Sequence, residues 1–171
     1  MSSVFRIASE LLTQVHDDLS RQHPFALERV AFLSCRTETL DGKGIGLLAD
    51  SLHVVADEDY EHSTSMGALI GGAAFRKVLQ YCYAHDVSMF HVHRHEHRGR
   101  PAFSRIDIQE NTKFVPDFFK VRPDQPHGAL VLSHDSMFGL IWKSRTMRPE
   151  RISKFVIAGG RAVEIDYEHI R

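Results

Sequence analysis

The sequence predicts a single α/β domain in which a mixed β-sheet is flanked by helices. The chain has 171 residues, which is enough for one domain with a hydrophobic core. Segments with helical spacing of apolar residues alternate with short apolar runs, in an order typical of layered α/β proteins. We find no internal repeat, low-complexity tract or linker that would divide residues 1–171 into two domains.

The first half of the chain predicts two helices and three strands. Apolar residues recur at helical spacing over 3–20, which predicts an amphipathic helix. Residues 28–36, 45–48 and 52–56 read as strands separated by turn signals and an acidic loop. Residues 65–84 predict a second helix, although three glycines lower the helix propensity of its first part.

The second half begins with a strand that is rich in histidine, over residues 87–95. Ser104 can cap a helix that runs to about Phe114, and the three prolines of 115–126 predict a loop. The remaining segments are two hairpins, 129–133 with 138–142 and 154–158 with 162–166.

Composition excludes several classes of protein. The formal net charge is −1, so no global basic field favours nucleic acid or an anionic membrane surface. No run approaches the roughly 18 apolar residues of a membrane span, and the N-terminus has no apolar signal core. Cys35 and Cys82 are too few for a disulfide framework or a thiolate zinc site. We therefore expect a soluble, cytoplasmic protein, and the sequence leaves its oligomeric state open.

The most informative segment is the histidine-rich strand. Side chains alternate between the two faces of a strand, so His91, His93 and His95 share one face. Two imidazoles near the twisted end of a strand can converge on one metal ion. The pair could be His93 with His95 or His91 with His93.

A carboxylate returned by the following loop would add a third ligand. Gly99 and Pro101 let that loop turn sharply, and Asp107 then lies at a helix start that faces back toward the strand. Three N/O ligands with an open fourth position are typical of a catalytic metal site. Ser104, one helical turn before Asp107, directs its hydroxyl toward the same place. Glu28, a charged residue that opens an apolar strand, is a candidate general base.

Together these residues resemble the JAMM (MPN-plus) metalloprotease pattern: an upstream Glu, then His-x-His, then Ser-x-x-Asp. The resemblance covers about residues 20–145. It implies an MPN-like domain with Zn²⁺ held by two histidines and Asp107. It also implies that Glu28 is the general acid and base and that Ser104 stabilises the oxyanion.

Two departures from the pattern bear on the choice of histidines. The family usually has proline after the second histidine, and here Glu96 or Arg94 stands in that place, depending on which pair binds. The spacing to Ser104 is one residue longer than usual from His95 and three longer from His93. We therefore favour His93 and His95 as the ligands, with His91 and His93 as the alternative.

The resemblance implies a zinc-dependent metallopeptidase that cleaves a peptide or isopeptide bond at the C-terminal tail of a ubiquitin-like protein. The expected partner is thus a ubiquitin-like protein or its conjugates, without nucleic acid or membrane. Two other functions are open: a non-catalytic MPN-type scaffold that binds proteins, and a metal hydrolase acting on a small-molecule amide.

Overall fold

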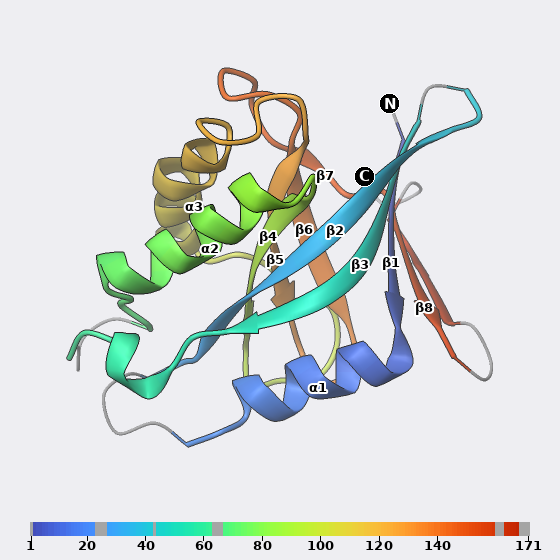
Figure 1. Cartoon of the computed structure of the whole chain (residues 1–171). Helices are drawn as coiled ribbons and strands as arrows, with labels where there is room; N and C mark the ends of the chain where they lie inside the picture. The colour runs from blue at the N-terminus through green and yellow to red at the C-terminus, as the bar shows by residue number, and fades with distance from the viewer. Residues whose placement is uncertain (1, 23–26, 43, 63–66, 160–162, 168–171) are drawn as a thin grey trace.

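The computed structural model describes residues 2–22, 27–42, 44–62, 67–159 and 163–167, and confirms a mixed α/β fold (Figure 1). The elements in chain order are β1 (Ser3–Ala8), α1 (Ser9–Leu19), β2 (Val30–Leu40), β3 (Gly44–Val54), a 3-10 turn (Asp57–Asp59), α2 (Gly72–Ala84), β4 (Ser88–Arg94), α3 (Arg105–Phe118), β5 (His127–Leu132), β6 (Met137–Trp142), β7 (Glu150–Arg151), β8 (Lys154–Ala158) and β9 (Val163–Asp166). The described strands form one nine-stranded sheet in the order β7-β6-β5-β4-β2-β3-β1-β8-β9.

The histidine-bearing strand β4 lies inside this sheet, antiparallel to β2 and parallel to β5. In the β2–β4 register Val30 pairs with His93 and Phe32 pairs with His91. Continuing that register by two residues sets Glu28 opposite His95, just beyond the ends of both strands. The pairing of two segments more than 60 residues apart therefore brings a carboxylate to the histidines.

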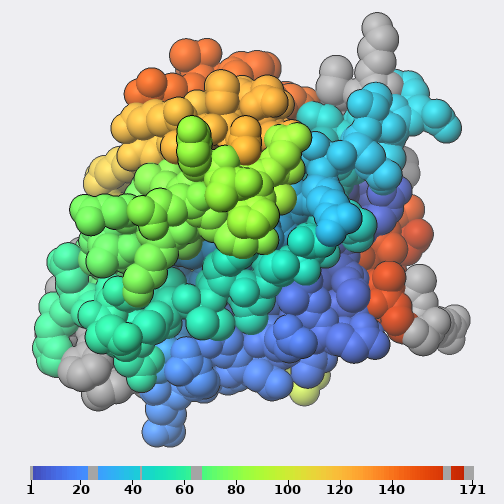
Figure 2. All heavy atoms as spheres, viewed as in Figure 1, coloured from blue at the N-terminus to red at the C-terminus, as the bar shows by residue number. Residues whose placement is uncertain are grey.

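The two faces of the sheet are covered by different helices. On one face, Val15 and Leu19 of α1 pack with Phe90 and Val92 of β4. On the other face, α2 and α3 pack over β2 and β4, where Phe118 joins the same core cluster. Figure 1 shows α1 set apart from α2 and α3. The space-filling view from the same side shows α2, in green, lying over the strands (Figure 2).

Two predicted helices are partly wrong. Residues 3–8 are strand β1, because alternate side chains are buried while the segment pairs in parallel with both β3 and β8. The helix predicted over 65–84 begins only at Gly72. Residues 67–71 before it are not helical, and 63–66 lie outside the described residues.

Other boundaries also differ from the sequence prediction. The strand predicted from residue 28 begins at Val30, and the strands predicted at 45–48 and 52–56 are one continuous strand, β3. Helix α3 extends through Pro116 into the predicted loop, because its last turns bury Val115 and Phe118. Both C-terminal hairpins form within one or two residues of the predicted bounds, apart from 160–162, which lie outside the described residues. In the described part of the chain, no helix is both long enough and apolar enough to cross a membrane.

Buried His127 makes stability depend on pH. Its Nδ1 accepts the backbone N–H of Met89 and its Nε2 lies 3.0 Å from the carbonyl oxygen of Arg122. Burial lowers the pKa of His127 to about 4, whereas the unfolded chain titrates near 6.5. The unfolded state therefore binds the extra proton first as the pH falls, and the folded state loses stability between these two values.

We expect the titration of His127 to lower the free energy of unfolding by about 2 kcal/mol between about pH 7.5 and about pH 5. Urea unfolding of wild type and His127→Asn at both pH values checks it, because asparagine can accept the Met89 N–H without titrating. An equally steep loss of stability in His127→Asn would contradict this assignment.

Candidate metal centre

The imidazoles of His93 and His95 converge at the end of β4. His93 is the penultimate residue of the strand and is only 2% exposed. His95 follows the strand, and its N–H donates to the carbonyl oxygen of Leu132 at 2.9 Å, which continues the pairing with β5. The two Nε2 atoms lie 3.2 Å apart. Of the pairs that the sequence left open, the structure thus brings His93 and His95 together.

The carboxylate of Asp107 adds a third donor atom beside the imidazoles of His93 and His95. Its Oδ2 lies 3.5 Å from Nε2 of His93 and 3.7 Å from Nε2 of His95. A capping box at the start of α3 holds this carboxylate. The Ser104 N–H donates to Oδ2 at 2.7 Å, and the Asp107 N–H donates to Oγ of Ser104 at 3.1 Å. The Ser-x-x-Asp motif therefore both starts the helix and aims the carboxylate.

The surroundings of Asp107 favour its ionised form. Burial by itself would raise the pKa of this carboxyl group. Hydrogen bonding and charge interaction with His93, together with the hydrogen bonds to Ser104, outweigh burial and hold the pKa well below its ordinary value. Asp107 is thus a carboxylate at neutral pH, the state that a metal ligand requires.

The donor set fits a small divalent cation. Ligand atoms about 2.0–2.1 Å from a tetrahedral zinc ion lie about 3.3–3.4 Å from one another. The three separations among His93, His95 and Asp107 are 3.2, 3.5 and 3.7 Å, close to that spacing without any rearrangement. Two imidazoles and one carboxylate can therefore hold a metal ion here and leave a fourth position for solvent or substrate.

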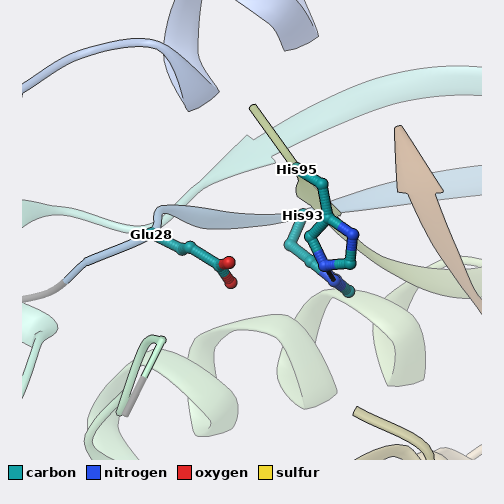
Figure 3. Close-up of side chains that lie close together, drawn as sticks. All are labelled: Glu28, His93 and His95. Carbon is teal, nitrogen blue, oxygen red and sulfur yellow. Dashed lines mark hydrogen bonds between the residues drawn. The ribbon is translucent and has the colours of Figure 1, made fainter. Parts of the chain in front are cut away.

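Glu28 lies beside the same group of atoms. It precedes β2, and its N–H donates to the carbonyl oxygen of Gly67 at 2.8 Å. One ligand atom from each of Glu28, His93 and His95 lies within 4.8 Å of the others. The close-up shows the Glu28 carboxylate pointing toward the two imidazoles (Figure 3). This carboxylate can either ligate an ion or exchange protons with a molecule bound next to it.

His91 lies in different surroundings, although it shares a face with His93. Its ring packs edge-on against Phe114, with centroids 4.9 Å apart, and against Phe32 at 5.5 Å. Burial is the largest cause that lowers the pKa of His91, to about 3; a hydrogen bond with Asn111 opposes it. His91 therefore lies among aromatic side chains and not in the group of donor atoms formed with His93 and His95.

The loop after His95 is fixed by residues that sequence reasoning did not assign to the site. The Asp135 carboxylate accepts the Gly99 N–H at 2.7 Å, and the His134 N–H donates to the carbonyl oxygen of His97 at 2.9 Å. His97 itself is exposed. The turn between β5 and β6 therefore anchors the loop that carries the chain from His95 to Ser104. In the sequence, His134 and Asp135 stand in the turn of the hairpin predicted over 129–133 and 138–142.

Ser104 is exposed at the start of α3, next to the carboxylate of Asp107. Its hydroxyl oxygen accepts the Asp107 N–H, and a hydroxyl group can also donate a proton. The side chain can therefore cap the helix and hydrogen-bond to a bound molecule at the same time.

Replacing Ser104 with alanine should affect both roles of the hydroxyl. We expect unfolding free energy to fall by about 1 kcal/mol through loss of the helix cap. If the site catalyses the hydrolysis that the JAMM resemblance implies, kcat should fall about 10²–10³-fold through loss of an oxyanion donor. Ser104→Thr keeps a hydroxyl and should restore most of both. A variant Ser104→Ala with normal kcat would show that the serine is only a helix cap.

Two hollows meet at this group of residues and share Glu28. One has a volume of about 690 Å³ and a lining that includes Arg29, Arg94 and His95. The other has a volume of about 350 Å³, and both His93 and Asp107 line it. A molecule that reaches the metal centre can therefore extend to either side of Glu28.

Comparison with known proteins gives no family assignment. No family model matches the chain, and no curated protein matches it. Among solved structures, the N-terminal domain of STIL from Trichoplax adhaerens aligns with a TM-score of 0.36 and 9% sequence identity. The alignment covers 78% of this chain and 39% of that one. A likeness at this level identifies neither the family nor the activity of the chain.

Proposed function

We propose that this protein is a zinc-dependent metallopeptidase that cleaves a peptide or isopeptide bond at the C-terminal tail of a ubiquitin-like protein. The observation that carries the proposal is the set of three donor atoms from His93, His95 and Asp107 with a carboxylate, Glu28, beside it. A site with three protein ligands and a neighbouring acid or base is the arrangement of catalytic zinc rather than structural zinc.

Each residue has a distinct role in the proposed hydrolysis. His93, His95 and Asp107 would hold zinc, which supplies a Lewis acid and lowers the pKa of water to about 7. Glu28 takes a proton from the attacking water and passes it to the leaving amine. The Ser104 hydroxyl donates to the oxyanion that develops on the scissile carbonyl group. Glu28 therefore serves first as base and then as acid.

The substrate class is supported by the sequence motif. Glu28, His93-x-His95 and Ser104-x-x-Asp107 resemble the JAMM pattern, whose members include enzymes acting on ubiquitin and related tails. The structure brings these motif residues, separated by up to 79 positions in the sequence, to one place. The hollows on both sides of Glu28 provide room for a polypeptide segment.

Metal analysis combined with three substrates tests the proposal. We expect purified protein to carry about one zinc ion per chain by mass spectrometry, in keeping with a single three-ligand site. It should cleave a ubiquitin-like protein with a C-terminal extension, lose activity with a chelator and regain it with zinc. Cleavage of small amides alone would indicate a small-molecule hydrolase. Folded protein that binds no zinc and cleaves none of the substrates would indicate a scaffold.

A further inference from the structure

The smaller hollow is apolar, although it borders a polar site. Its lining adjoins the proposed centre at Glu28, His93 and Asp107. Its apolar lining includes six side chains on β2, the 67–71 segment, α2 and α3: Val30, Phe32, Ala68, Ile70, Phe75 and Phe114. The side chains of His91, Glu110 and Asn111 line it as well. A cleft with mainly hydrophobic walls and a few polar groups at one end is the usual form of a site that selects its ligand.

The aromatic side chains of this wall are fixed by one another. The Phe75 ring lies 6.1 Å from that of Phe114 and 6.5 Å from that of Phe32, measured between centroids. Phe118, fully buried behind them, contacts the Phe75 ring at 5.3 Å. The hollow is thus bounded by packed rings from two helices and a strand, so its shape does not depend on one mobile side chain.

The rim of the hollow exposes apolar side chains to solvent. Ile106 is 54% exposed and Leu69 is 42% exposed, and both line the opening. The charge of Glu110, which also lines the hollow, is balanced by an ion pair of 2.6 Å with Lys113. Exposed apolar surface gathered around a functional site marks contact with a ligand. Away from Glu28 and Asp107, which border the proposed centre, the apolar walls favour an uncharged, apolar ligand group.

The position of the hollow defines which part of a polypeptide would enter it. A chain that crosses from the larger hollow to the smaller, apolar one passes Glu28, which lines both. The peptide group beside Glu28 is the one that the proposed chemistry would cleave. The side chain directed into the apolar hollow then belongs to a residue adjacent to that bond.

We propose that the apolar hollow is a specificity pocket for a large apolar side chain, of the size of leucine, methionine or phenylalanine, on a residue next to the scissile bond. This inference rests on the proposed peptidase activity and names the substrates that the site selects. A glycine in that position would leave the aromatic walls in contact with water, and the favourable free energy of burying an apolar side chain would be lost. The residues that determine specificity are Ala68, Phe75 and Phe114.

A peptide library tests the pocket and the activity separately. Zinc-loaded protein is incubated with peptides randomised on both sides of a cleavable segment, and the products are sequenced by mass spectrometry. We expect leucine, methionine and phenylalanine at one flanking position to be preferred about 10- to 100-fold over glycine in kcat/KM. Cleavage with no preference, or with a preference for glycine or charged residues, would overturn the pocket and leave the peptidase standing.

Two variants change the pocket in opposite directions. Ala68→Phe should fill it and shift the preference toward glycine and alanine, while cleavage of those small residues persists. Phe75→Ala should enlarge it and weaken selection against bulkier side chains. Tyr83→Ala, a matched loss of an aromatic ring at an exposed position of α2, should leave the preference unchanged. An unaltered preference in folded Ala68→Phe would contradict the pocket assignment.

A binding measurement tests whether the pocket accepts an apolar side chain, even if no peptide is cleaved. In that case the proposed activity fails, and NMR then compares N-acetylphenylalaninamide with N-acetylglycinamide as probes. We expect only the phenylalanine derivative to shift the methyl resonances of Ala68 and Ile106. The absence of such shifts would overturn the pocket as well.

Discussion

Replacing Glu28 with glutamine should lower kcat for hydrolysis about 10²–10⁴-fold while the zinc content stays unchanged. Glutamine keeps the size of the side chain but cannot take up and return a proton, and general acid–base groups contribute about this much to catalysis. Steady-state kinetics on the extended ubiquitin-like substrate, with metal analysis of the same preparation, checks both parts of the prediction.

The zinc content of Glu28→Gln also separates two donor sets. Glu28 lies close enough to His93 and His95 to act as a ligand in place of Asp107. A ligand role predicts that Glu28→Gln loses both zinc and activity, whereas a base role predicts that it loses activity alone. Glu96→Gln is the matched control, because this carboxylate follows His95 but pairs with Arg94 and is exposed. We expect Glu96→Gln to retain activity and zinc, and full activity in Glu28→Gln would refute the mechanism.

Replacing Asp107 with asparagine should weaken zinc binding by at least about 100-fold and abolish hydrolysis at limiting zinc. Loss of a residue that only supports a ligand already lowers metal affinity about 10–100-fold, so loss of a charged ligand should do at least as much. Asparagine can still accept the Ser104 N–H, so the start of α3 is kept while the negative charge is removed. Competition with a chromophoric zinc chelator measures the change in affinity.

Asp117→Asn is the matched control for this variant. Asp117 lies on the same helix and pairs with Lys120 at 2.6 Å, and it contributes no atom to the donor group. We expect its zinc affinity to equal that of wild type. If Asp107→Asn bound zinc as tightly as Asp117→Asn does, Asp107 would not be a ligand, and Glu28 would be the remaining carboxylate of the site.

Local patterns in the sequence were sufficient to predict some strands and helix starts correctly. Alternation in the 87–95 segment predicted a strand with three histidines on one face, and β4 is that strand with His91 and His93 facing α2 and α3. Ser104 and Asp107, three residues apart, predicted a helix start, and both bonds of the capping box are present. These features follow from backbone periodicity and from hydrogen bonds between near neighbours, which short stretches of sequence determine.

Other local patterns were overridden by contacts between distant segments. The apolar residues over 3–20 predicted one helix, but residues 3–8 lie between β3 and β8 and are extended. Pro116 suggested a loop, but burial of Val115 and Phe118 continues α3 past it. Short apolar runs fit either a strand or a helix, and the pairing partner decides between them.

The sequence by itself determined the chemical groups of the site and the order in which the chain presents them. Only the tertiary structure decided that the imidazoles of residues 93 and 95 meet one another, while that of residue 91 is enclosed by aromatic rings. It also decided that Glu28 approaches them and that phenylalanines from three elements enclose an apolar hollow alongside. The physical reason is that strand register and helix docking are set by the burial of the whole core, which no short segment encodes.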